Sequence, residues 1–138
     1  MIIETKRLIL TEYTLSDIDD FYNLKSCPEV WTYSTFVPLN SKEQTRPLLQ
    51  DIITCCTNGK YTFMALREKT SKAFIGEAGI IDANPHANRC TIGYNLLPSF
   101  WNNGYATEIV KGIIAYVFNT LKYERIEALT LQRNSASL

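Results

Sequence analysis

The segment of clearest chemical interest runs from Asn95 to Glu108, with the sequence NLLPSFWNNGYATE. A strand-like run leads into a turn containing Gly104, and a helical pattern follows that turn. The first turn of such a helix presents free backbone N–H groups, here from about Asn103 to Ala106, with the positive end of the helix dipole behind them. Gly104 and Ala106 lack bulk, so a phosphate or pyrophosphate could approach the backbone closely. The segment therefore predicts an anion-binding site.

A purely structural alternative stays open, in which Gly104 only caps a turn before an ordinary helix. The segment is not the nucleoside-triphosphate loop, because no Gly-Lys-Ser or Gly-Lys-Thr follows the turn. It is not the three-glycine dinucleotide fingerprint either. The local pattern alone favours neither the anion site nor the simple turn.

The cysteines and the single histidine do not indicate a metal site. His86 and Cys90 supply too few ligands for zinc, and no Cys-x-x-Cys is present. Cys55 and Cys56 are adjacent, which is an awkward disulfide framework. Since the amino terminus does not resemble a signal peptide, we expect reduced thiols and a cytoplasmic protein.

Length and charge narrow the class of protein further. The 138 residues include 14 Lys+Arg and 14 Asp+Glu, and this balance argues against direct nucleic-acid binding. The longest apolar stretch, residues 109–118, contains Lys111 and is far shorter than the ~20 residues that span a bilayer. Without repeats or linkers, residues 1–138 are expected to form a single domain.

The amino-terminal part predicts a strand followed by a helix. Residues 7–13 are apolar and β-branched, as is typical of a strand. Thr14 and Asp17 match a capping box, which begins a helix with Phe21 and Lys25 at helical spacing. The helix is expected to end near Pro28.

A second helix is predicted before residue 60. Ser41 and Gln44 repeat the capping-box pattern, and an apolar stripe follows them. Pro47 leaves the start of this helix open between Ser41 and Pro47 itself, because proline inside a helix removes a hydrogen bond. Asn58-Gly59 is expected to end it.

The rest of the chain predicts a sheet. Strand-like runs at residues 61–68, 73–81 and 89–97 favour an antiparallel meander. A helical pattern between Ile109 and Leu121 then precedes another strand-like run at 124–131. Because a helix connects the last two strands, we expect those strands to be parallel. The predicted fold class is α/β, with a mixed, mostly antiparallel central sheet flanked by helices.

Four segments carry a resemblance to a known family: ETKRLIL near the start, FIGEAGI at 74–80, IGYNLLPSFWNNGYATE at 92–108, and RNSAS near the end. Together they resemble the GNAT superfamily of acetyl-CoA-dependent N-acetyltransferases, in the branch of the ribosomal-protein N-terminal alanine acetyltransferases. The segments span almost the whole chain in the family's order. The resemblance implies a GNAT-like fold and direct acetyl transfer from acetyl-CoA to a primary amine, of a protein N-terminus or a small molecule, without a metal.

The resemblance also implies where coenzyme A binds. Its pyrophosphate would lie on the backbone amides of the turn, and its pantetheine arm would follow the preceding strand. In this family Gly and a basic residue often precede the glycine of the turn, so one favourable charge beside the phosphates is expected to be missing here. The implied cofactor-binding residues are Leu96, Leu97, Trp101, Asn102, Asn103, Gly104, Tyr105, Ala106, Thr107 and Asn134.

Two residues are candidates for catalysis. Glu77 is expected to act as the general base, directly or through water, while N–H groups near Leu96 polarise the thioester carbonyl. Ser137 is the candidate near the leaving sulfur, with Tyr94 or Tyr105 as substitutes. Because side chains in a strand alternate between two faces, an exposed Glu77 that faces solvent and takes no part in catalysis is an equal alternative.

Asn134 and Ser137 also have a structural alternative, as residues that cap a helix. The chain ends at Leu138, where members of the family generally continue through a helix and two further strands. A non-catalytic acyl-CoA-binding or degenerate acetyltransferase fragment therefore stays an alternative function. An interaction domain in which Phe100 and Trp101 only pack is another. An open sheet edge would favour a homodimer.

Overall fold

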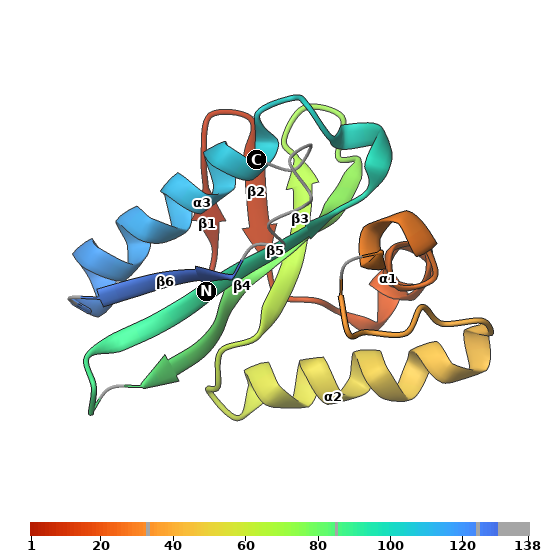
Figure 1. Ribbon diagram of the computed structural model, residues 1–138, viewed down its shortest axis with the longest axis horizontal. Coiled ribbons are helices and arrows are strands. Elements are labelled where there is room, and N and C mark those ends of the chain that lie inside the picture. The colour runs from red at the N-terminus through yellow and green to blue at the C-terminus, as the bar shows by residue number, and fades with distance from the viewer. Residues whose placement is uncertain (33, 85, 124, 130–138) are drawn as a thin grey trace.

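A computed structural model describes residues 1–32, 34–84, 86–123 and 125–129 (Figure 1). It contains one sheet of six strands, in the spatial order β1-β2-β3-β4-β5-β6. The elements in chain order are β1 (Ile3–Glu4), β2 (Leu8–Thr11), α1 (Ile18–Lys25), α2 (Thr45–Thr57), β3 (Phe63–Glu68), β4 (Phe74–Asn84), β5 (Arg89–Leu96), α3 (Tyr105–Tyr116) and β6 (Arg125–Leu129).

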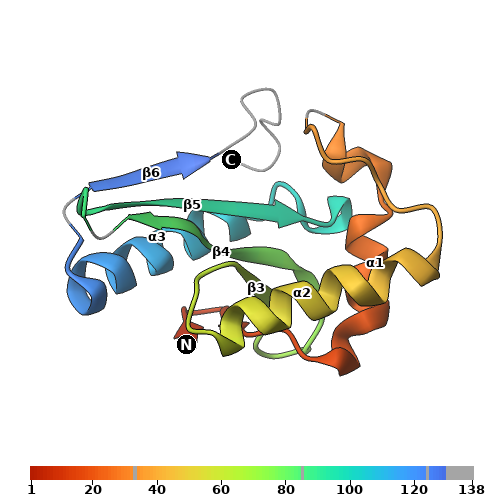
Figure 2. The same ribbon diagram turned by 90° about the horizontal axis from the view of Figure 1, so that it is seen from below.

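The sheet confirms the predicted mixed topology. Strands β1 to β5 pair antiparallel with their neighbours, whereas β6 pairs parallel with β5, from Arg89 opposite Arg125 to Gly93 opposite Leu129. Both views show β6 beside β5 at the outer edge of the sheet (Figures 1 and 2). The parallel pairing follows from the connection through α3, which returns the chain to the end of the sheet where β5 began.

Helices cover the two faces of the sheet separately (Figures 1 and 2). Ile109 and Ile113 of α3 are fully buried in one core cluster, with Leu10 and Leu66 from the sheet. Helices α1 and α2 bury a second cluster on the other face, which contains Phe21, Leu24, Leu49 and Ala65. This segregation leaves the carboxyl end of β5 between the two layers.

The ends of α1 and α2 refine the sequence predictions. The capping box is present, since the Asp17 carboxylate accepts the Thr14 N–H at 2.8 Å, and a 3₁₀ turn then leads into α1. Helix α2 begins at Thr45, after a 3₁₀ turn. This start lies between Ser41 and Pro47, the two limits that the sequence left open. Pro47 is tolerated because it is the third helical residue, where no intrahelical acceptor exists for its missing N–H. Gly59, with a φ of 74°, ends the helix as expected.

A close approach between β4 and β5 explains Gly76, the first of the two glycines in FIGEAGI. A Cβ atom on Gly76 would lie 2.2 Å from the carbonyl oxygen of Asn95, and the φ of Gly76 is 156°. Gly76 pairs with Leu96, and the next residue, Glu77, pairs with Asn95. The register therefore places the side chain of Glu77 beside that of Asn95, one residue before the end of β5.

Candidate active site

The turn between β5 and α3 has the backbone geometry of an anion-binding site. Asn102 and Gly104 both adopt left-handed conformations, with φ values of 64° and 76°. Successive amides around left-handed residues form a concave cluster of N–H groups, and the positive end of α3 lies directly behind this one. Asparagine tolerates the left-handed region better than most residues, which accounts for Asn102 at this position.

Hydrogen bonds hold the turn against the end of β5. The Trp101 indole Nε1 donates to the carbonyl of Leu96 at 2.8 Å, and the Asn103 side chain donates to the carbonyl of Trp101 at 3.1 Å. The Glu108 N–H donates to the Gly104 carbonyl at 3.0 Å, which closes the first turn of α3. The implied cofactor residues from Leu96 to Thr107 therefore form one continuous, ordered segment.

The residues of the turn differ in solvent exposure, and so in which of their groups a ligand could contact. Asn102, Asn103, Gly104 and Thr107 are exposed. The side chain of Ala106 packs in the core, so its small size serves packing against the sheet, and the residue offers a ligand only its backbone. Close approach of a phosphate to the turn then depends on Gly104 and on the exposed amides.

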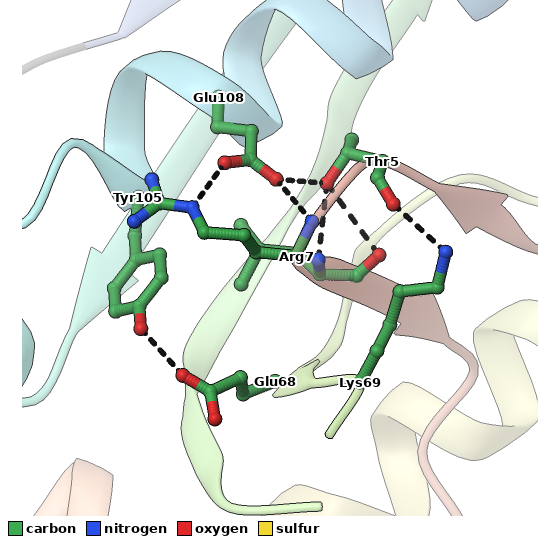
Figure 3. A network of polar contacts seen from close by, with 7 residues as sticks. Thr5, Arg7, Glu68, Lys69, Tyr105 and Glu108 are labelled. Atoms are coloured by element: carbon green, nitrogen blue, oxygen red, sulfur yellow. Dashed lines mark hydrogen bonds and ion pairs between the residues drawn. The ribbon is translucent and has the colours of Figure 1, made fainter. Parts of the chain in front are cut away.

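A polar network fastens the start of α3 to the amino-terminal strands (Figure 3). Arg7 Nε donates to Glu108 Oε1 at 2.6 Å, and the Arg7 backbone N–H donates to Glu108 Oε2 at 2.9 Å. The Thr5 hydroxyl also donates to Glu108. Burial opposes ionisation of Glu108, but the hydrogen bonds from Thr5 and Arg7 outweigh it and hold its pKa below the usual value.

The same network brings a positive charge beside the turn. The Arg7 guanidinium lies 4.4 Å from the centroid of the Tyr105 ring, and a Cβ on Gly104 would lie 3.4 Å from one of its terminal nitrogens. Sequence reasoning assigned no role to Arg7, although ETKRLIL was part of the resemblance. The Tyr105 hydroxyl donates to Glu68 at 2.6 Å, which raises the pKa of Tyr105 and holds its hydroxyl at the end of β3. Because its hydroxyl is held by Glu68, Tyr105 is a poor substitute for Ser137 near the leaving sulfur of the coenzyme.

Glu77 is completely buried, so the alternative of a carboxylate that faces solvent is wrong. The cause is the register of β4, which directs this side chain towards α1. Its Oε1 accepts from the Tyr13 hydroxyl at 3.0 Å, and its Oε2 accepts from Lys25 Nζ at 2.7 Å and Asn95 Nδ2 at 2.8 Å. Burial and the neighbouring carboxylate charge raise the pKa of Tyr13 well above its usual value.

Four aromatic rings surround the ammonium of Lys25. The distances from Nζ to the ring centroids are 4.7 Å for Trp31, 5.2 Å for Phe36, 5.3 Å for Phe21 and 5.5 Å for Phe63. We call these four rings, with Glu77, the ammonium cage. Sequence reasoning missed the cage, although one signal was available: Lys25 lies four residues after Phe21, on the apolar stripe of α1.

Asn134 and Ser137 lie outside the described residues. Within the part of the chain that the structure describes, no group of three His, Cys, Asp or Glu side chains could hold a metal ion. Over the same residues, no helix is both long and apolar enough to cross a bilayer.

Comparisons with known proteins agree with this geometry. Residues 7–138 match the model of the acetyltransferase (GNAT) domain. A protein of Bacillus licheniformis named uncharacterized N-acetyltransferase p20 is 31% identical over 134 residues, which cover 97% of this chain and 75% of that protein.

Solved structures show the same fold. An acetyltransferase of the GNAT family from Bacillus anthracis superposes with a TM-score of 0.81 at 20% identity, over 99% of this chain and 78% of that one. RimL, a ribosomal L7/L12 alpha-N-protein acetyltransferase in complex with coenzyme A, superposes with a TM-score of 0.73 at 21% identity, over 85% of this chain and 67% of that one.

The family match extends from β2 through the turn and α3, so it includes both Glu77 and the predicted anion-binding segment. It confirms the expected fold class, the enzyme class and the expected acetyl donor. The chain belongs to the GNAT family of N-acetyltransferases, which use acetyl-CoA.

Proposed function

We propose that this chain transfers the acetyl group of acetyl-CoA to a primary amine, of a protein N-terminus or a small molecule, by direct attack. The observation that carries the proposal is the turn with left-handed Asn102 and Gly104, two exposed residues that lie between the end of β5 and the start of α3. A pyrophosphate bound there would leave the rest of the coenzyme to extend along β5 towards Glu77.

The coenzyme phosphates would bind the backbone amides between Trp101 and Thr107. The basic residue expected before Gly104 is absent. The guanidinium of Arg7, the residue before β2, supports the proposal because it brings a positive charge to the same turn. Asn134 is proposed to hold the pantetheine region, as the resemblance implies.

The thioester would lie at the end of β5. The described pairing of β5 with β6 runs from Arg89 to Gly93, so Leu96 and Leu97 lie beyond it, where an extended pantetheine arm could pair with the strand. The backbone N–H of Leu96 would stabilise the oxyanion that develops when the amine attacks, because the N–H of Leu97 already donates to the Ile75 carbonyl at 2.9 Å. Ser137 is proposed to lie near the leaving sulfur.

Glu77 is proposed to accept the proton of the attacking amine, directly or through water. Its position beside Asn95 supports this role, because Asn95 immediately precedes the strand end where the thioester would lie. Among the described contacts, Oε1 accepts only from Tyr13, whereas Oε2 accepts from two donors. Oε1 is therefore the oxygen with capacity for a further donor.

Further proposals concern the whole chain. We propose that residues 1–138 act as one domain that does not bind nucleic acid, which the zero net charge supports. A cytoplasmic location is supported by four cysteines that form no disulfide. Because β6 is an outer strand of the described sheet, a homodimer formed through this edge is also proposed.

Calorimetric titration of the purified chain with acetyl-CoA tests the function, with ADP as the control for a simple phosphate site. Binding that requires the pantetheine arm, followed by thiol release in the presence of primary amines, is the expected result. Binding without thiol release for any amine would support a non-catalytic acyl-CoA-binding protein instead. A folded chain that does not bind acetyl-CoA would contradict both functions.

A further inference from the structure

The ammonium of Lys25 lies beside one carboxylate oxygen of Glu77, the residue proposed as the general base. Its Nζ lies 2.7 Å from Glu77 Oε2, and the two side chains are 7% and 0% exposed. An external amine that reached this oxygen would meet Lys25 first. The amine that is already positioned for transfer of its proton to Glu77 therefore belongs to the chain itself.

The ammonium cage resembles a recognition site for an alkylammonium group more than a simple ion pair. Aromatic faces attract a desolvated cation, and four of them lie within 5.5 Å of Nζ. The rings come from separate segments: Phe21 from α1, Trp31 and Phe36 from the residues after α1, and Phe63 from β3. All four rings belong to the first half of the chain, and Glu77 of β4 completes the cage.

The cage lies next to the proposed position of the thioester. Lys25 Nζ and Asn95 Nδ2 both lie within 2.8 Å of the same oxygen, Glu77 Oε2. Asn95 immediately precedes Leu96, near which the carbonyl of the acetyl group is proposed to bind. Helix α1 and helix α3 pack on opposite faces of the sheet, so Lys25 approaches the end of β5 from the face opposite α3 (Figure 1).

We propose that Lys25 is itself an acetyl acceptor, so that the chain acetylates its own Lys25 from bound acetyl-CoA. This inference rests on the proposed function. The Lys25 ammonium transfers one proton to the Glu77 carboxylate, and the neutral amine attacks the thioester carbonyl carbon. The new N–C bond forms as the C–S bond breaks, and the thiolate takes the second proton from the nitrogen. The products are Nε-acetyl-Lys25, coenzyme A thiol and a proton held by Glu77.

Mass spectrometry of the wild-type chain after incubation with acetyl-CoA tests the proposal. We expect one acetyl group per chain, mapped to Lys25, and a burst of one equivalent of free thiol without any added amine. Exposed lysines provide the internal comparison, since the side chains of Lys42 and Lys69 are 72% and 38% exposed. Proximity should label Lys25 at least ~10-fold faster than either one. The rate should not depend on the concentration of the chain.

Two variants and one control sharpen the assignment. Lys25→Arg keeps a cation in the cage and should remove the label, whereas Lys42→Arg should leave the label on Lys25 unchanged. Chain unfolded in urea should lose the preference for Lys25, because the cage no longer exists. The wild-type result stands even if Lys25→Arg fails to fold, since the site is read directly from the peptide map.

Each outcome separates this inference from the proposed function. Acetyl-CoA binding without acetylation of Lys25, or with label only on the exposed lysines, overturns the inference and leaves the function intact. A rate that rises with chain concentration shows transfer between molecules and overturns the intramolecular step. Absence of acetyl-CoA binding in the calorimetric titration removes the proposed function and this inference together.

Discussion

Arg7 and Glu108 are 101 residues apart in the sequence, and their side chains meet at 2.6 Å where β2 passes the first turn of α3. The contact fixes the start of α3, the helix whose first amides are proposed to bind the coenzyme phosphates. It also holds the Arg7 guanidinium beside Gly104, where coenzyme phosphates would add a second anionic partner. One residue thus links the stability of the helix start to the charge of the proposed site.

Replacing Arg7 with Met should weaken acetyl-CoA binding about 10-fold, because one cation near the phosphates is lost. Calorimetric titration at two salt concentrations checks this, and the difference from wild type should shrink at high salt. Lys6→Met is the matched control, since Lys6 is the exposed cation next in sequence. Equal loss of affinity in both variants would remove Arg7 from the site.

Replacing Gly104 with Glu should abolish acetyl-CoA binding in a chain that stays folded. The left-handed backbone costs a non-glycine residue about 1–2 kcal/mol, and the new carboxylate would repel the phosphates. Gly59→Glu is a close control, because Gly59 has nearly the same φ, 74° against 76°, and lies at the end of α2. Both variants should lose similar stability to urea, and only Gly104→Glu should lose binding; retained binding would refute this placement of the phosphates.

Replacing Glu77 with Gln should slow acetyl transfer, alter the pH–rate profile and leave the affinity for acetyl-CoA unchanged. It should also lower the free energy of unfolding by about 3 kcal/mol, because the buried ammonium of Lys25 loses its counter-ion. In urea denaturation, the double variant Lys25→Met with Glu77→Gln should be more stable than Glu77→Gln alone. An unchanged pH–rate profile in Glu77→Gln would exclude Glu77 as the base.

The stabilising contribution of the Glu108 carboxylate should depend on pH. Its pKa is lowered in the folded chain from an ordinary value of 4.5, so this stabilisation is fully present above that value. It should be lost as the pH falls through the lower, folded pKa. The difference in unfolding free energy between wild type and Glu108→Gln, measured in urea from pH 7 downwards, should therefore narrow in acid. A constant difference would contradict the pKa shift.

Local patterns were enough to predict the order of the elements from β2 onwards and the turn before α3, but not the short strand β1. The capping box at Thr14, the stop at Gly59 and the glycine before α3 each act within a few residues, so their effect can be read without the fold. The parallel pairing of β6 also followed from the sequence, because a helical connection between two strands leaves few topologies. The start of α2 at Thr45 does not follow from the sequence, since the 3₁₀ turn before it gives no separate periodic signal.

Only the tertiary structure decided the surroundings of Glu77. Strand alternation names two faces but does not say which one α1 covers, so a buried and an exposed carboxylate were equally compatible with the sequence. The partners of Glu77 lie 64, 52 and 18 residues away, at Tyr13, Lys25 and Asn95. Arg7 reached the turn in the same way, through a contact across 101 residues. Local propensity carries no information about such pairs, because they exist only once the sheet has set its register and the helices have packed on it.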